Sequence, residues 1–521
     1  MTSKLVLGLD VGTQGTKAVL YDLESHSIVA KGNASYGIIE STTQGRAEQH
    51  PENWRQAVKE ATAQALNGIN ASCVVGIGVS GQQHGLVVLG DDGQVLRPAK
   101  LWCDTESAAE ADELSQKFGW KLVSISWDMP WIFYLLLPDI QHASVCPCKS
   151  AALSYSREGS PLLREAPAGT IPSSVPFASP SRSHPPSKVP SFTITKLLWL
   201  KRHEPEVFDS VRSVLLPHDY INSWLTGRRV MECGDASGTG VLDVAGRQWD
   251  VAAMDAVDPR VRSMFPPLAS SPEEVVGLLL PEVASELGLP AGVIVAPGSG
   301  DNAMSALGAG AAGDGETVVS LGTSGTIFAK SPIPILDPTG VICPFCDATG
   351  AYLPLLCTLN CTRVLEEVRE AFALDHTTLT ALAQREPAGC SGVTWLPYLI
   401  GERTPSWPHA SGALLGLRPG CLRPGLLYRA AIEGATLSLL SGFRRMMSAG
   451  LQPSRQLRLV GGGAKSVLWR QVVADAFQME VLLPAEPDSA ALGAALQAAA
   501  VVEGDSVLSY VTKHQPPMLD V

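Results

Sequence analysis

The chain begins with two short apolar runs that flank a polar turn. Residues 4–9 form the first run, which ends at Asp10, and residues 17–21 form the second. Apolar runs of this length, bounded by glycine and polar residues, are typical of paired strands. The pattern therefore predicts a β-hairpin that turns at residues 12–15.

The same pattern returns in the second half of the chain. Residues 316–321 and 326–329 are expected to form strands, and the polar turn Gly322-Thr323-Ser324-Gly325 lies between them. A strand, a glycine-threonine turn and a returning strand are thus present twice. This repetition indicates an internal duplication.

Helices are expected between and after the hairpins, where apolar residues recur at intervals of three and four. The spacing predicts helices over residues 54–65, 218–225, 366–373, 426–449 and 468–477. Continuous apolar runs predict buried strands over residues 74–79 and 456–460, and a short strand with a turn is expected at residues 234–240. Strands alternate with helices, so the predicted fold class is α/β.

One stretch does not follow this pattern. Residues 124–189 contain 13 Ser and 10 Pro among 66 residues and have no sustained helical or strand period. A chain of this composition buries too little apolar surface for a packed core, so we predict a disordered or loosely packed insertion. Its removal would leave a short loop, and we hypothesise that it is translated non-coding sequence, such as a retained intron.

Composition and charge restrict the function classes. The 521 residues suffice for two or more domains, and 45% hydrophobic with 17% charged residues fit a globular chain. A formal net charge of −12 argues against electrostatic capture of nucleic acid or anionic lipid. No apolar run reaches the ~18 residues of a membrane span, and the N-terminus has no signal-peptide core. We therefore expect neither nucleic acid nor membrane as a partner, and a cytoplasmic location.

The eleven cysteines are expected to be reduced thiols, as is usual in an intracellular chain. Cys343 and Cys346 have the spacing of a redox or zinc pair, but the sequence offers no second pair at ligand spacing. The reduced-thiol interpretation is therefore preferred.

The two polar turns carry residues that suit phosphate binding. Asp10 ends the first strand, and residues 12–14 follow it. A strand-end carboxylate can hold Mg²⁺ directly or through water, while glycines and threonines offer N–H and O–H donors to an oxyanion. An ordinary hairpin turn would have similar residues, but the second copy at Gly322 and Thr323 favours the phosphate-binding interpretation.

Two further turns precede helices. Asp301 opens a helix of small residues after Gly300. It could simply cap that helix, or it could accept a proton from a hydroxyl, because the helix N-terminus keeps a carboxylate ionised. Residues 461–464 form a glycine-rich turn that could support a nucleotide base or ribose, although a tight strand-to-helix turn would look the same.

A third group of polar residues suits a polyhydroxylated substrate. Gln83 and His84 follow the predicted strand at 74–79, and Trp102 and Asp104 add an aromatic face and a carboxylate. A lone histidine is more often structural, but its glutamine neighbours favour a binding site. Glu402 and Arg403 are interpreted as structural residues that brace a loop.

These motifs, in this order, resemble those of the FGGY family of sugar kinases, and the resemblance covers nearly the whole chain apart from residues 124–189. They are Asp10-x-Gly-Thr, Ser80-Gly-Gln-Gln-His-Gly85, Leu101-Trp-x-Asp104, Gly300-Asp-Asn302, Leu321-Gly-Thr-Ser-Gly325, Gly401-Glu-Arg-Thr-Pro405, Gly461-Gly-Gly-Ala464 and Ala490-Ala-Leu-Gly-Ala494. The resemblance implies an actin-like ATPase fold of two ribonuclease-H-like domains around a central cleft. Residues 1–312 would form the sugar-binding domain and residues 313–521 the nucleotide-binding domain.

The resemblance also implies roles for individual residues. Asp301 is the expected general base on the sugar hydroxyl, and Asp10 is the expected Mg²⁺-associated acid. The expected nucleotide contacts are Gly12, Thr13, Gln14, Gly322, Thr323, Gly462, Gly463 and Ala464. The expected sugar contacts are Gln83, His84, Trp102, Asp104 and Asn302.

The implied reaction transfers the γ-phosphoryl group of ATP, with Mg²⁺, to the terminal hydroxyl of a ketopentose, and D-xylulose is the first expectation. Kinases for D-ribulose, glycerol or gluconate are alternatives within the family. An actin- or chaperone-like ATPase that binds a protein is an alternative outside it, in which Gln83, His84 and Trp102 would have no use. A homodimer is left open.

Overall fold

The predicted N-terminal hairpin is present in the computed structural model, which describes residues 4–117 and 191–519. Strand β1 (Leu5–Val11) pairs antiparallel with β2 (Gly15–Asp22), and Val11 lies opposite Thr16 across the turn. Successive side chains of a strand point to opposite faces, and β1 is buried at every position except Asp10, so both faces of the sheet are covered here. The prediction for this hairpin is confirmed.

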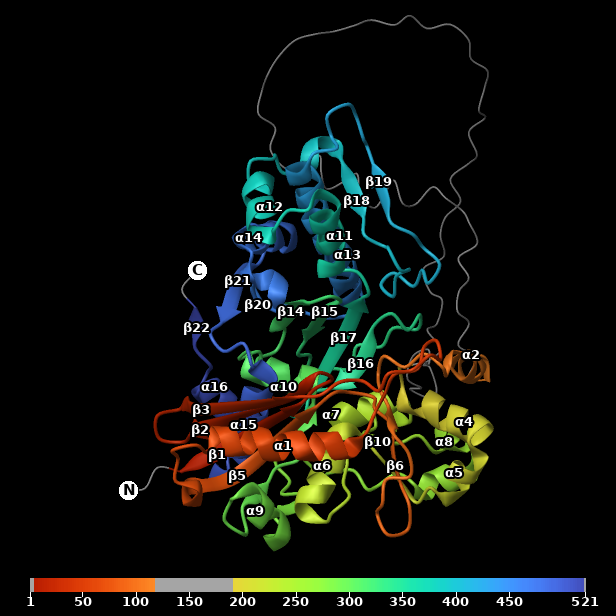
Figure 1. Ribbon diagram of the computed structural model, residues 1–521, viewed down its shortest axis with the longest axis vertical. Coiled ribbons are helices and arrows are strands. Elements are labelled where there is room, and N and C mark those ends of the chain that lie inside the picture. The colour runs from red at the N-terminus through yellow and green to blue at the C-terminus, as the bar shows by residue number, and fades with distance from the viewer. Residues whose placement is uncertain (1–3, 118–190, 520–521) are drawn as a thin grey trace, which may run out of the picture. The chain divides into compact units, whose positions relative to one another are not determined.

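This hairpin belongs to a sheet with the order β11-β12-β5-β1-β2-β3. Figure 1 labels four of these strands, β1, β2, β3 and β5. The other strands are β3 (Ser27–Ser35), β5 (Val74–Gly81), β11 (Gly277–Leu278) and β12 (Ile294–Val295), and β13 (Ser299–Gly300) pairs with the end of β5. β1, β5 and β12 run parallel, while β2 and β11 are antiparallel to their neighbours.

The second sheet repeats this arrangement, with the order β22-β21-β20-β14-β15-β17-β16. Its strands are β14 (Thr317–Leu321), β15 (Gly325–Ala329), β16 (Cys343–Cys346), β17 (Tyr352–Thr358), β20 (Gln456–Val460), β21 (Glu480–Pro484) and β22 (Met518–Leu519). β14, β20 and β21 run parallel, and β15 and β22 are antiparallel, as in the first sheet. The expected duplication is therefore present in strand order and direction.

Helices cover both sheets, and the five helices expected from the spacing are present. The helices are α1 (Pro51–Ala65), α2 (Ala108–Lys117), α4 (Thr193–His203), α5 (Pro205–Ser210), α6 (Pro217–Thr226), α7 (Cys233–Ala236), α8 (Val251–Asp255), α9 (Pro281–Leu287), α10 (Asp301–Gly308), α11 (Thr362–Phe372), α12 (His376–Ala383), α13 (Pro424–Ser448), α14 (Val467–Phe477), α15 (Ser489–Glu503) and α16 (Val507–Lys513). Short strand pairs complete the structure: β4 (Glu48–Gln49) with β7 (Ala99–Lys100), β6 (Val87–Leu89) with β8 (Ser213–Leu215), β9 (Leu242–Asp243) with β10 (Gln248–Trp249), and β18 (Thr394–Leu396) with β19 (Ala413–Leu415).

The prediction of a strand and turn at residues 234–240 was wrong. Helix α7 occupies the start of this stretch and a 3₁₀ turn occupies Ser237–Thr239. Glu232 caps α7, because its side chain accepts hydrogen bonds from the N–H groups of Gly234 and Asp235. Glycines are typical of turns, whereas the cap formed by Glu232 stabilises the start of a helix here.

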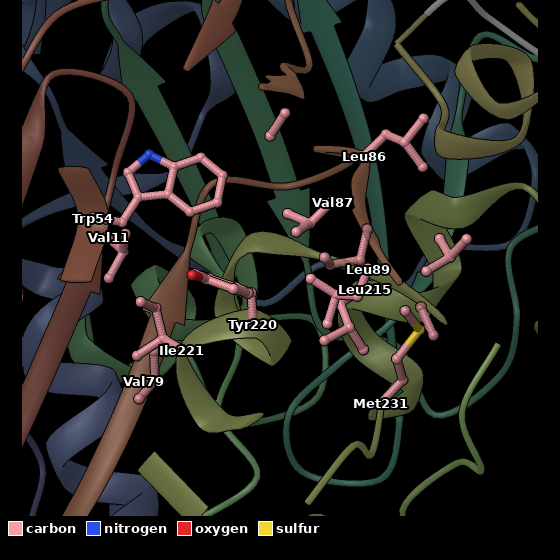
Figure 2. Close-up of a cluster of buried hydrophobic side chains, with 14 of the residues drawn as sticks. Val11, Trp54, Val79, Leu86, Val87, Leu89, Leu215, Tyr220, Ile221 and Met231 are labelled. Carbon is pink, nitrogen blue, oxygen red and sulfur yellow. The ribbon is translucent and has the colours of Figure 1, made fainter. Parts of the chain in front are cut away.

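The core of the first half lies between the sheet and helices α1 and α6. Figure 2 shows Trp54 of α1 beside Val11 and near Tyr220 and Ile221 of α6. Trp54 is fully buried and its indole N–H donates to Gln49 Oε1 at 2.9 Å. Gln49 in turn donates to the carbonyl oxygen of Thr13 at 2.7 Å, so the packed core also holds the first polar turn in place.

Helix α15 packs unusually close to its neighbours through glycines. A Cβ atom placed on Gly8 or Gly78 of the sheet would lie 2.1 or 2.0 Å from a carbonyl oxygen of α15. On the other side, a Cβ on Gly493 of α15 would lie 1.8 Å from the carbonyl oxygen of Met304 in α10. Since real Cβ contacts need more than 3 Å, only glycine permits α10, α15 and the sheet to touch by their backbones.

Some expectations lie outside the described residues. The predicted insertion at residues 124–189 is one of them. The described residues belong to one compact unit that spans both sheets.

The nine cysteines among the described residues are free thiols, in line with the expectation. Cys343 and Cys346 are three residues apart, so they lie on opposite faces of β16.

Among residues 4–117 and 191–519, no single helix combines the length and hydropathy of a membrane span. Only α15 and α16 taken together pass that test, and they are bent by 111° relative to each other.

We predict that Gly493→Ala destabilises the protein by about 1–3 kcal/mol, because the added methyl group meets a backbone carbonyl that moves only if α10 shifts. In an open helix the same change would stabilise by about 1 kcal/mol. Gly37→Ala is the matched control, since nothing lies within 4 Å of a Cβ there. Urea midpoints measure the difference, and a Gly493→Ala midpoint at or above that of the wild type would contradict the close packing.

Candidate active site

The strand register brings the two expected catalytic carboxylates to one edge of the first sheet. Asp10 of β1 lies opposite Ser80 of β5, and Ser80 lies opposite Ser299 of β13. These parallel strands end together, and α10 begins at Asp301, two residues beyond Ser299. The Ser80 hydroxyl donates to Asp10 Oδ1 at 3.0 Å, which fixes the orientation of that carboxylate.

Asp301 does not cap its helix. The N-cap residue of α10 is Gly300, and Asp301 is the first helical residue. Its Oδ1 instead accepts a hydrogen bond from Asn302 Nδ2 at 3.0 Å. The capping alternative is therefore wrong, and the carboxylate is available for chemistry.

Burial raises the pKa of Asp301 to about 8, and the negative charges of Asp10 and Asp235 act in the same direction. Burial also raises the pKa of Asp10, although Lys17 and the Ser80 hydrogen bond oppose the rise. A carboxylate with a pKa near neutrality is a stronger base than an ordinary aspartate, which suits proton transfer from an alcohol.

A buried acidic cluster lies behind Asp301 and consists of His218, Asp219, Glu232 and Asp235. His218 Nδ1 is 2.7 Å from Asp235 Oδ2, and all four side chains are buried. Burial raises the pKa of the three carboxyl groups, that of Asp219 to about 8. Glu232 also accepts a hydrogen bond from the Ser299 hydroxyl at 2.8 Å, so the cluster anchors the strand that leads into Asp301.

The first polar turn is arranged to present N–H groups. Its carbonyl oxygens accept hydrogen bonds from the protein: Gly12 from the Tyr36 hydroxyl at 2.7 Å and Thr13 from Gln49 at 2.7 Å. The N–H and C=O groups of a trans peptide point in opposite directions. The N–H groups of Thr13 and Gln14 therefore face away from Tyr36 and Gln49, as a phosphate-binding turn requires.

The second polar turn uses the start of α11 in the same way. The N–H groups of Thr362 and Cys361 donate to the carbonyl oxygens of Gly322 and Thr323 at 2.9 and 3.1 Å. This turn has three residues between its paired strand ends, whereas the first has four. The N–H groups that share peptide bonds with these two carbonyls therefore point away from α11.

The expected adenosine loop lies directly against the second turn. A Cβ on Gly461 or on Gly463 would be 2.7 Å from Leu321, the residue before Gly322. Gly462 has nothing within 4 Å of such an atom, so its backbone faces open space, and Ala464 is buried. The structure therefore brings Gly322, Thr323, Gly462, Gly463 and Ala464 together at one edge of the second sheet.

The two sheets approach each other at Asp301. Helix α10 contacts β15, and the charge of Asp301 helps to raise the pKa of the Cys357 thiol on β17, after burial as the main cause. The carboxylate at the edge of the first sheet is thus within electrostatic range of the second.

Three expected sugar contacts lie together beside Asp301. Asn302 Nδ2 donates to Gln83 Oε1 at 2.8 Å, and His84 follows Gln83. His84 Nδ1 lies 3.0 Å from the carbonyl oxygen of Gly238, which can only accept, so Nδ1 carries the proton and Nε2 is an acceptor. Burial, together with the positive charges of Lys196 and Arg403, lowers the pKa of His84 to about 3, so its ring is neutral.

Trp102 lies at the first polar turn. Its side chain is 40% exposed, and its indole N–H donates to Thr13 Oγ1 at 3.0 Å. The Thr13 hydroxyl in turn donates to Gln82 Oε1 at 3.1 Å. An exposed aromatic face beside the turn could cover a sugar or a phosphate.

Asp104 lies elsewhere, in a buried ion cluster. Its Oδ2 accepts hydrogen bonds from the N–H of Ala47 at 2.9 Å and from Lys100 Nζ at 3.1 Å. Carboxylate oxygens of Glu48, Asp104 and Glu106 lie within 4.8 Å of one another, as in a metal site, but the Lys100 ammonium contacts all three. The structure does not bring Asp104 together with the other expected sugar contacts, and a sugar-binding role for it stays a prediction.

Glu402 braces a loop, as the sequence indicated. Its carboxylate accepts hydrogen bonds from the N–H groups of Leu359 and Arg403 and from Asn360 Nδ2. The charge of Arg403 contributes to lowering the pKa of His84 and opposes the rise in the pKa of the Cys357 thiol, and its structural role stays a prediction.

Sequence reasoning missed the residues that surround His84 and Asp301. They include Lys196 of α4 and Asp235 of α7, which are buried charged residues. Lys196 lies in the apolar sequence Ile-Thr-Lys-Leu-Leu-Trp-Leu, and a lysine on the buried side of such a helix was the available signal.

Comparison with known proteins identifies the class. The model of the FGGY family of carbohydrate kinases matches this chain with its N-terminal domain at residues 5–126 and 187–308, and with its C-terminal domain at residues 317–502. The chain belongs to this family and is a carbohydrate kinase with the actin-like ATPase fold, as the resemblance implied. The match leaves out residues 127–186, which lie within the predicted insertion.

Individual relatives are similar over nearly their full lengths. The xylulose kinase of Haemophilus influenzae is 36% identical, over 95% of this chain and 90% of the relative. The xylulose kinase of Streptomyces coelicolor is 36% identical, over 99% of this chain and 92% of the relative. The crystal structure of xylulose kinase from Bifidobacterium adolescentis superposes with a TM-score of 0.76 at 30% identity, covering 97% of this chain and 94% of that chain.

We predict that phosphoryl transfer depends on pH through Asp301. A base works only when deprotonated, and its raised pKa means that kcat/KM rises as the pH approaches about 8 and falls as Asp301 gains a proton below it. The affinity for ATP without sugar serves as the control and should not follow this limb. A constant kcat/KM between about pH 6 and about pH 9 would contradict the assignment.

Proposed function

We propose that this kinase transfers the γ-phosphoryl group of ATP to the terminal hydroxyl of D-xylulose. The observation that carries the proposal is the position of Asp301, beside Asp10 at the sheet edge and next to Asn302, Gln83 and the neutral His84. Relatives named xylulose kinases, 36% identical over most of the chain, support the choice of sugar.

Asp301 would accept the proton of the sugar hydroxyl as the phosphoryl group arrives. Phosphoryl transfer has a loose transition state, so the protein mainly positions the reactants and neutralises charge. The N–H groups of the turn at residues 12–14 and of the turn at Gly322 and Thr323 suit the phosphate oxygens. The open backbone of Gly462 suits the adenosine part of ATP.

Asp10 fits a role in holding Mg²⁺. Asp10 is the second-last residue of β1, beside the first phosphate turn, and Mg²⁺ prefers carboxylate, water and phosphate oxygens. When bound, Mg²⁺ neutralises the charge that develops on the phosphates. Lys17, whose charge opposes the rise in the pKa of Asp10, helps to keep this carboxylate ionised.

The sugar side offers a defined set of donors and acceptors. His84 Nε2 accepts a hydrogen bond from a hydroxyl, because Nδ1 carries the ring proton. The Asn302 and Gln83 side chains are linked to each other, which holds their remaining polar atoms in fixed directions. A polyol with adjacent hydroxyls matches this set.

The proposal also assigns a function to each half of the chain. We assign residues 1–312 to the sugar-binding domain and residues 313–521 to the nucleotide-binding domain, with the insertion at 124–189 outside both functions. We expect a cytoplasmic enzyme that works on small molecules as a monomer or homodimer. The net charge of −12 is consistent with the absence of nucleic acid and membrane partners.

A panel of sugars tests the function. We expect D-xylulose to stimulate ADP formation most strongly, with D-ribulose, glycerol and gluconate weaker, because the hydroxyl pattern must match fixed donors and acceptors. Coupled assay of ADP with and without each sugar measures this. Sugar-independent ATP hydrolysis would favour an actin- or chaperone-like ATPase, and a stronger response to another sugar would replace D-xylulose.

We predict that Asp301→Ala lowers kcat by at least about 10²-fold, the lower end of a general-base contribution. Asp375→Ala is the control, since Asp375 also lies at a helix start, where it caps α12 through Thr378. That control loses a cap without touching the site, so its kcat should stay near the wild-type value. Near-normal turnover in Asp301→Ala would overturn the assignment.

A further inference from the structure

Lys196 is a fully buried lysine on the apolar side of α4. It lies among Ile194, Leu197 and Leu198, which are also buried, and its side chain has no exposed surface. Its ammonium donates to three main-chain carbonyl oxygens: that of Ser191, that of His84 at 3.3 Å and that of Phe192 at 3.5 Å. Two of these belong to the start of α4, but His84 comes from a different part of the fold.

The backbone of His84 is held in a conformation that a histidine seldom adopts. Its φ is +64°, in the left-handed region. The His84 carbonyl oxygen accepts hydrogen bonds from Lys196 Nζ and from Thr193 Oγ1, the latter at 3.2 Å, so two side chains of α4 fix this peptide group. A strained backbone of this kind persists only where its surroundings hold it.

The ring of His84 is held independently of its backbone. Nδ1 is hydrogen-bonded to the Gly238 carbonyl oxygen, and the ring contacts those of Phe192 and Phe345, with centroids 5.4 and 5.7 Å away. A Cβ on Gly238 would come within 2.0 Å of Nδ1, so the ring fills that space. Together these contacts leave Nε2 as the free acceptor of the ring.

Stability alone does not account for a charge at this position. Removing an ammonium from water is costly, and burial lowers the pKa of Lys196 to about 7. A methionine of similar length would pack among the same leucines without that cost. The ammonium, however, supplies a donor that reaches the His84 carbonyl from α4.

We propose that Lys196 is a positioning residue for sugar binding, which holds the His84 main chain so that Nε2 meets a sugar hydroxyl. The inference rests on the proposed function for the identity of the substrate class. It adds to that function the element that sets the direction of one sugar contact.

Substitution of Lys196 by methionine tests the proposal. Because His84 contacts the sugar before and during transfer, Lys196→Met should raise KM for the sugar by about tenfold and leave kcat within about threefold. KM for ATP should not change. Lys201→Met is the matched control on the same helix, since Lys201 donates to Val257 and pairs with Asp258, away from His84, and should keep wild-type kinetics.

A second pair of variants keeps the test valid if Lys196→Met does not fold. Thr193→Val removes the other donor to the His84 carbonyl and should raise KM for the sugar by about threefold. Thr195→Val is its control, because that hydroxyl donates to Phe192 and not to His84. Equal KM values in these two variants would overturn the proposal.

A double variant separates positioning from a general structural effect. In a His84→Gln background, Lys196→Met should raise KM for the sugar by less than about threefold, because the residue acts through His84. The same tenfold rise in both backgrounds, or a lower urea midpoint with an unchanged KM, would assign Lys196 a merely structural role. All variants are measured with whichever sugar the wild type phosphorylates best, so failure on D-xylulose overturns the proposed substrate and leaves this test intact.

Discussion

The backbone contact of α15 with α10 and with the first sheet determines where the chemistry lies. Glycines at positions 8 and 78 in the sheet, and at 308 and 493 between the helices, let carbonyl groups approach to distances that any side chain would forbid. Asp301 is the first residue of α10, and Asp10 is the second-last residue of β1. The same close contact therefore fixes Asp301, the proposed base, relative to the strand that carries Asp10.

The duplication supplies two similar turns, but the chemistry is not symmetrical. Asp10 stands two residues before Gly12, whereas Ser320 occupies the same place before Gly322. Opposite these residues, Ser80 donates to Asp10, and Val460 pairs with Ser320. The first turn thus follows a carboxylate, whereas the second follows a serine and lies against the glycine-rich residues 461–463.

Electrostatics around the site follow from burial more than from paired charges. His218, Glu232 and Asp235 lie within the protein behind Asp301, and burial raises the pKa of each carboxyl group in this region. His84 shows the opposite shift for the same reason, because burial disfavours its charged form. A neutral imidazole beside a basic carboxylate is well suited to bind hydroxyl groups and remove one proton.

The sequence by itself determined the hairpins, the main helices, the duplication and the family, because strand and helix periods and glycine-threonine turns are local patterns. It misjudged residues 234–240 and left open whether Asp301 caps its helix, and it did not reveal that Lys196 holds His84 or that Lys100 contacts the carboxylates around Asp104. Those features depend on which residues burial brings together from distant segments. Only the tertiary structure decides that, since hydrogen-bond partners and desolvation are set by packing and not by spacing along the chain.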